Sequence, residues 1–217
     1  MSTSSAAVLE RPNKRVQQAA ETRQRLIDAA ARLFAGRGYA ASTVAAIGEE
    51  AGVSRGLVNF HFKAKEKLLH AVIEQLVDEL ENQMFPSDPP EDPLLALAIL
   101  VDAHRRFLTE QPQRARLLFR LQAEALNPSL GVDAFALLHR RWIERTQSWW
   151  REGIAGGQID PSLDHDAVTT FTVGALRGIA LEWLLAPGAV DIEAAYAHLL
   201  RSLQAGLLPF SSLAAPS

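Results

Sequence analysis

The sequence predicts an all-α protein with a small N-terminal helical part and a larger helical body. Apolar residues recur at spacings of three and four through most of the 217 residues, as on one face of a helix. Gly and Pro signals end each such segment, and no alternating apolar and polar run is long enough for a sheet. Prolines 86, 89, 90 and 93 crowd an acidic stretch that cannot be helical, which marks the boundary between the two parts.

The N-terminal part is expected to begin with a flexible arm, residues 1–18, rich in Ser, Thr and Ala. A helix from Glu21 to Ala35 follows and ends at the glycines near position 37. Its apolar stripe consists of Leu26, Ala30, Leu33 and Phe34. This helix should support the short helices that come next.

Residues 43–67 predict two short helices joined by a sharp turn. The first runs from Thr43, whose hydroxyl can cap it, and stops at Gly52, where a residue without Cβ can adopt a positive φ. Ser54 caps the second helix, which points Val53, Val58 and Phe62 inward and leaves Arg55, Gly56, Leu57, Asn59 and His61 toward solvent. Arg can pair with guanine, Asn with adenine, and Leu can contact a thymine methyl group. The pattern predicts a helix-turn-helix that reads the major groove of DNA.

The segment AGVSRGLVNFHFKAKEKLL resembles the pattern of the TetR family of one-component bacterial regulators. The resemblance covers roughly residues 20 to 75. It implies that Arg55, Leu57 and Asn59 face bases and that Thr43, His61 and Lys65 meet phosphates; Ser54 and Gly56 complete the predicted DNA-binding set.

Two positions depart from the family pattern. Asn59 stands where most relatives have a tyrosine, so the resemblance implies an adenine-reading amide in place of a phosphate or thymine contact. Ala64 stands where a Ser, Asn or Asp normally caps the next helix, and losing such a cap costs about 1 kcal/mol.

Charge is distributed unevenly along the chain. Residues 1–70 hold 11 Lys and Arg against 6 Asp and Glu, a net charge of +5, whereas the other 147 residues hold 11 against 19, a net charge of −8. A basic N-terminal part and an acidic remainder are expected when only the N-terminal part contacts DNA phosphates. A DNA-packaging protein would be basic throughout, and chance asymmetry of solvated charges is the plainer alternative.

The body is expected to contain a long helix from Lys65 to about Met84 that connects the two parts, followed by helices at about 94–110, 112–126, 130–155, 164–186 and 191–207. Small residues on one side of the penultimate helix would let a second copy approach closely, and a C2 dimer would present two reading helices to a palindromic site. The alternative is that the last two helices pack only within one chain. The predicted dimer interface consists of Phe171, Gly174, Ala175, Gly178, Tyr196, Leu199 and Leu203.

Aromatic residues gather in the middle helices, where regulators resembling this one hold an effector. The predicted lining of a mostly apolar pocket is Phe107, Phe119, Gln122, Trp142, Trp149, Phe171 and Arg177. Aromatic residues at helical spacing also fill ordinary cores, so both interpretations stay open. Arg177 needs either a carboxylate partner within the chain, which we prefer at this point, or an anionic ligand.

Several classes of site are not indicated. The chain has no cysteine, which excludes disulfides and thiolate metal sites. No apolar run approaches the ~20 residues of a membrane span, the first residues lack a secretory signal, and a cytoplasmic protein without membrane contact is expected. The six histidines are scattered, and Asp164 and Asp166 at a helix start are expected to cap it rather than bind a metal. We therefore expect no catalysis, no cofactor and no metal.

These observations predict a ligand-responsive regulator of transcription, a homodimeric repressor released from a palindromic double-stranded DNA operator by an unidentified small molecule. The expected domains are the arm 1–18, a helix-turn-helix domain 19–66, a connecting helix 67–85, and an effector-binding and dimerisation domain 86–217. The alternative is a helical small-molecule-binding protein or enzyme whose helix-turn-helix is only a scaffold.

Overall fold

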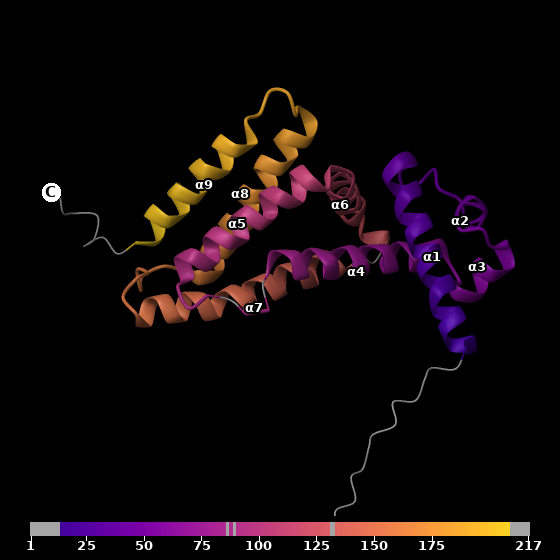
Figure 1. Ribbon diagram of the computed structural model, residues 1–217, viewed down its shortest axis with the longest axis horizontal. Helices are drawn as coiled ribbons and strands as arrows, with labels where there is room; N and C mark the ends of the chain where they lie inside the picture. Colours follow the sequence, from indigo (N-terminus) through magenta and orange to yellow (C-terminus); the bar gives the residue numbers. More distant parts are fainter. Residues whose placement is uncertain (1–13, 86, 89, 131–132, 209–217) are drawn as a thin grey trace, which may run out of the picture. The chain divides into compact units, whose positions relative to one another are not determined.

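The computed structural model describes residues 14–85, 87–88, 90–130 and 133–208. These residues form α-helices, one short 3₁₀ helix and connecting turns, with no strand among them (Figure 1). The expected all-α class is therefore confirmed. The chain divides into two compact units, Met1–Val72 and Ile73–Ser217, and the division falls inside the long helix rather than at either of its ends.

The first unit contains α1 (Lys14–Arg37), α2 (Val44–Glu50), α3 (Arg55–His61) and the start of α4 (Lys65–Met84). The expected apolar stripe of α1 is buried, and Ile27 and Ala29 join it. The expected start of this helix at Glu21 is wrong, because α1 already begins at Lys14. Residues 14–20 are good helix formers whose side chains are all exposed, so no apolar period reveals them. The rest of the expected arm lies outside the described residues.

The second unit contains the rest of α4 and the elements that follow it: α5 (Pro93–Glu110), α6 (Pro112–Ala125), η1 (Pro128–Leu130), α7 (Ala134–Ala155), α8 (His165–Leu185) and α9 (Ile192–Leu207). Helix α5 packs against α6, α7, α8 and α9, and so forms the centre of this unit. Four of the five helices expected here agree with the structure to within one residue at each end. The exception is α7, which starts later than expected because Pro128–Leu130 form the separate 3₁₀ turn.

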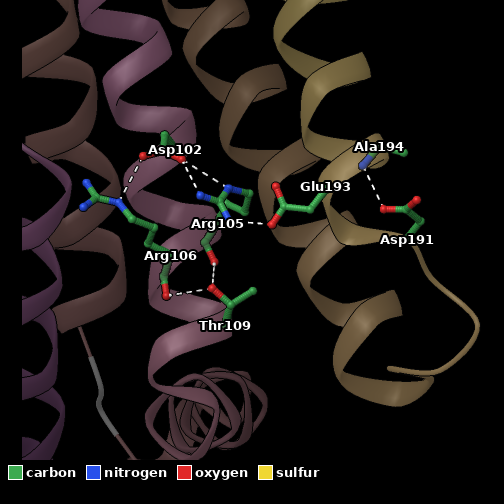
Figure 2. Close-up of polar contacts among 7 residues, drawn as sticks. All are labelled: Asp102, Arg105, Arg106, Thr109, Asp191, Glu193 and Ala194. Atoms are coloured by element: carbon green, nitrogen blue, oxygen red, sulfur yellow. Dashed lines mark hydrogen bonds and ion pairs between the residues drawn. The ribbon is translucent and has the colours of Figure 1, made fainter.

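Helices α5 and α9 are fastened together by polar contacts as well as apolar ones. Arg105 of α5 pairs with Asp102 of its own helix at 2.7 Å and with Glu193 of α9 at 2.6 Å (Figure 2). One residue earlier on α5, Nδ1 of His104 lies 2.6 Å from the hydroxyl of Tyr196, and both side chains are buried. These contacts fix the position of α9 along α5.

This arrangement buries part of the predicted dimer interface inside one chain. Tyr196, Leu199 and Leu203 are all buried within the second unit, with Tyr196 only 2% exposed. They face inward because α9 uses its apolar stripe to cover α5, so these three residues pack inside one chain. The sequence alone could not separate an inward stripe from an intermolecular one, because both have the same period.

Helix α8 has apolar residues on two sides. One side is buried through Val173, Leu176, Ala180 and Leu184, and the opposite side leaves apolar residues in solvent: Phe171 at 64% exposure, Leu181 at 44% and Leu185 at 72%. The expectation that no apolar run approaches a membrane span is wrong for this helix. It has an 18-residue window of mean hydropathy 1.3, of which 33% is buried. By length and composition alone it could cross a membrane, and the excess apolar character comes from its exposed side.

Candidate functional site

The first unit builds a helix-turn-helix from α2 and α3. The side chain of Thr43 accepts a hydrogen bond from Ala46 N at 3.1 Å and caps α2, and Ser54 accepts one from Leu57 N at 3.3 Å and caps α3. Gly52 has φ +67° in the turn between them, a backbone conformation that favours glycine. Val58 is buried and anchors α3 to its unit. Both predicted caps and the predicted turn are therefore present.

The outer face of α3 presents the side chains expected to read DNA. Arg55, Leu57 and Asn59 are exposed, as are Ser54, Gly56 and Thr43, and His61 is half-buried. The side chains of Arg55 and Asn59 have no hydrogen-bonding partner among the described residues. The donors and acceptors that base recognition requires are free on this face.

Phe60 also lies on the surface of α3 and was missed at the level of sequence. It is 76% exposed and packs edge-on against His61, with ring centroids 5.2 Å apart. Its neighbour Phe62 is buried, as expected. Because an aromatic pair two residues apart must point to different sides of a helix, the inward assignment of Phe62 could have revealed the outward Phe60.

Lys65 has a different environment from the one expected. Its Nζ donates to the carbonyl oxygens of Tyr39 at 2.9 Å and Ala40 at 3.4 Å, and lies 4.1 Å from the centre of the Tyr39 ring. These contacts join the start of α4 to the loop after α1. An ammonium group has three N–H donors, so one remains for a phosphate. Lys63 and Lys67 are exposed on either side.

The second unit contains a pocket of about 650 Å³ that is lined by α6, by α8 and by the first residues of α7. A smaller cavity of about 20 Å³ shares three of its lining residues, Phe119, Gln122 and Arg177, and extends to the buried side chains of His104 and Trp142. Burial, followed by the positive charge of Arg177, lowers the pKa of His104 to about 4, so this imidazole is neutral. The pocket lining is Phe119, Gln122, Ala123, Ala125, Leu126, Phe135, Ala136, Arg177, Gly178 and Leu181.

The structure sorts the predicted pocket residues into three groups. Phe119, Gln122 and Arg177 line the pocket, and Trp142 lines the smaller cavity beside it. Phe107 and Trp149 line neither, since both are core residues, and Phe171 borders a separate groove between α8 and α9. Several lining residues were missed, although Phe119, Gln122, Ala123 and Leu126 have the spacing of one face of α6.

Comparison with known proteins identifies the first unit. The family model described as "Bacterial regulatory proteins, tetR family" matches residues 26–72. The helix-turn-helix regulator TtgW of Pseudomonas putida, itself uncharacterised, is 32% identical over 132 residues, which are 60% of this chain and 90% of TtgW. The chain belongs to the TetR family. The resemblance seen in the sequence is thus confirmed, and with it a DNA-binding regulator of transcription that is not an enzyme.

Other members of the TetR family match over most of the chain. The transcriptional repressor KstR2 of Mycolicibacterium smegmatis is 28% identical over 180 residues, covering 81% of this chain and 85% of KstR2. A crystal structure of a TetR regulator from Chloroflexus aurantiacus superposes with a TM-score of 0.74 at 23% identity, over 88% of this chain and 98% of the other. This likeness shows that the body also has the TetR fold. The alternative in which the helix-turn-helix is only a scaffold is not supported.

Proposed function

We propose that this TetR regulator is a homodimeric, cytoplasmic repressor that binds a palindromic operator and releases it when a small molecule binds the pocket of the second unit. The observation that carries the proposal is the pairing, in one chain, of a free base-reading face on α3 with an apolar pocket of about 650 Å³. Repression is supported by the similarity to the repressor KstR2.

The proposed DNA contacts are supported by the exposed outer face of α3 and by the residues on either side of it. Arg55, Leu57 and Asn59 read bases, with Ser54 and Gly56 at the start of the helix, where small residues allow the backbone to approach DNA. Thr43, His61 and the remaining donor of Lys65 contact phosphates. Phosphate contacts give affinity without sequence preference, whereas base contacts give the preference.

The dimer is supported by the exposed side of α8. Phe171, Gly174, Gly178, Leu181 and Leu185 follow one another at spacings of three and four, and all are exposed. A Cβ added to either glycine would meet no atom of the described residues within 4 Å, so the packing in this part of the chain does not require a small residue there. We infer that the two glycines make room for the α8 of a second copy. Ala175 is half-buried at the edge of this surface.

The ligand and the operator would be coupled through α4, which belongs to both units. A ligand that favours a dimer with the wrong separation of reading helices lowers DNA affinity. A coupling of about 1–3 kcal/mol, or about 5- to 150-fold, suffices, and operator DNA must then weaken ligand binding by the same factor.

Two experiments test this proposal. Selection of bound DNA from a random duplex pool, by the purified protein without ligand at about physiological salt, should enrich a palindrome with half-sites about one helical turn apart. Analytical ultracentrifugation should show a dimer that Phe171→Glu dissociates. Leu95→Glu is the matched control, because Leu95 is an apolar residue on α5 that is 50% exposed, against 64% for Phe171. No enriched palindrome, or a dimer that Phe171→Glu leaves intact, would contradict the proposal.

A further inference from the structure

Arg177 differs from the other arginines that pack between helices. Arg105 pairs with Asp102 and Glu193, and Arg141 pairs with Glu81. Arg177 lies half-buried in α8 and has no ion pair or hydrogen bond among the described residues. Burial alone acts on the pKa of Arg177 and lowers it, with no carboxylate present to raise it. The intramolecular partner preferred from the sequence is therefore absent from the described part of the chain.

The guanidinium belongs to the lining of both cavities. Among the described residues, no Asp or Glu lines either the pocket of about 650 Å³ or the smaller cavity beside it. Removing a charge from water without a partner is costly, and proteins usually compensate it with an ion pair. The free-energy cost of partly burying the Arg177 charge would be offset if a bound ligand supplied the negative charge.

The groups around Arg177 supply further donors. Gln122 lines both cavities and carries a side-chain NH₂ group. Trp142 lines the smaller cavity and is only 5% exposed, and its buried Nε1–H has no acceptor among the described residues. A buried donor without an acceptor is destabilising, because it has lost its hydrogen bonds to water. Arg177, Gln122 and Trp142 therefore place several hydrogen-bond donors, and no carboxylate of the described residues, around the two cavities.

The rest of the pocket is apolar. Its walls include Phe119, Phe135, Leu126 and Leu181, and its volume lies in the range of small-molecule sites, about 300–1,000 Å³. A ligand that matches both the apolar walls and the donors near Arg177 needs an apolar body and one group that accepts several hydrogen bonds and carries negative charge.

We propose that the pocket binds amphipathic organic anions, with the carboxylate or an equivalent acidic group of the ligand on Arg177 and its apolar body between α6 and α8. This inference rests on the proposed function for the existence of an effector site, and it adds the chemical class of the effector. Guanidinium and carboxylate groups pair through two parallel hydrogen bonds, which suits recognition of a planar anion.

The test uses two fluorescent probes that differ in charge. 8-Anilino-1-naphthalenesulfonate is an anion, and N-phenyl-1-naphthylamine has the same rings without the sulfonate. Both are titrated into the full chain and into Arg177→Gln, which keeps a polar side chain and removes the charge. The anion should bind the variant roughly 10- to 100-fold more weakly, whereas the neutral probe should change less than about twofold.

Two further variants separate the charge from the fold. Arg177→Lys keeps the positive charge and should recover part of the affinity for the anion. Arg151→Gln is the matched control, because Arg151 is exposed on α7 and lines none of these cavities, and it should behave as the unmodified chain. The thermal unfolding midpoint of Arg177→Gln should match or exceed that of the unmodified chain, since an unpaired, half-buried charge has been removed.

The inference is overturned if Arg177→Gln weakens both probes equally, if it leaves the affinity for the anion unchanged, or if neither probe binds. Operator affinity is measured separately with and without the anion. If the anion binds in an Arg177-dependent way but operator affinity does not change, the proposed function is contradicted. The inference that the pocket binds organic anions would then still hold.

Discussion

Replacing Gly48 with alanine should destabilise the first unit although alanine is the better helix former. Gly48 is a buried residue of α2, and a Cβ built there would lie 3.0 Å from the Val53 carbonyl oxygen and 3.0 Å from Cγ2 of Val58. Neither neighbour moves freely. Val58 is the buried anchor of α3, and the Val53 carbonyl belongs to the backbone just before Ser54, the cap of α3.

The expected magnitude combines two opposing effects. Alanine gains about 1 kcal/mol over glycine in a helix interior. Forcing a methyl group into a closely packed site costs about 1–3 kcal/mol. Gly48→Ala should therefore lose roughly 0–2 kcal/mol of unfolding free energy. Making room for the methyl group would displace Val53 and Val58 and so move the start of α3. Operator affinity should therefore fall as well.

Gly36→Ala is the matched control. Gly36 lies in the last turns of α1, has no positive φ, and has no atom within 4 Å of its Cβ position. It should gain up to about 1 kcal/mol. Urea unfolding followed by far-UV circular dichroism, at one protein concentration, measures both variants. If Gly48→Ala proves as stable as Gly36→Ala, the contacts inferred between α2 and α3 are wrong.

Three further substitutions test the site. Asn59→Ala should relax base preference at one position per half-site and cost about 1–3 kcal/mol, as measured by repeated selection from a random pool. Lys65→Ala should lower the thermal unfolding midpoint by losing its bonds to the Tyr39 and Ala40 carbonyls, at about 0.5–1.5 kcal/mol each, whereas Lys67→Ala, at an exposed position, should not. The folded-state pKa of His104, about 4, lies below its ordinary value of 6.5, so the unfolded chain binds a proton that the folded chain does not. Stability should fall as pH drops from 6.5 to 4, by at most about 1.4 kcal/mol per pH unit, and His104→Gln should reduce this slope in thermal unfolding at several pH values.

Local signals account for what was predicted well. The hydroxyl caps at Thr43 and Ser54, the positive φ of Gly52 and the proline and glycine stops of the body act within a few residues of chain, so the sequence contains everything needed to place them. The start of α1 was placed too late for the complementary reason. Its first turns, from Lys14, bury nothing, and helix propensity without an apolar period gives no boundary.

Long-range packing accounts for what was not predicted. The apolar stripes of α8 and α9 look alike in sequence, yet Tyr196 is buried beside His104 of α5 whereas Phe171 remains in solvent. Likewise, Phe107 and Trp149 were as plausible for the pocket as Phe119, and only the arrangement of the helices separates core from cavity.

The sequence by itself determined most helix boundaries, the helix-turn-helix and the exposure of Arg55, Leu57 and Asn59 on α3, because caps, turns and helical period depend on neighbours in the chain. The tertiary structure alone decided which stripe each helix buries, what Lys65 contacts, and that Arg177 has no carboxylate partner among the described residues. Those outcomes depend on side chains that are distant in sequence and adjacent in space, and no local pattern specifies such a neighbour.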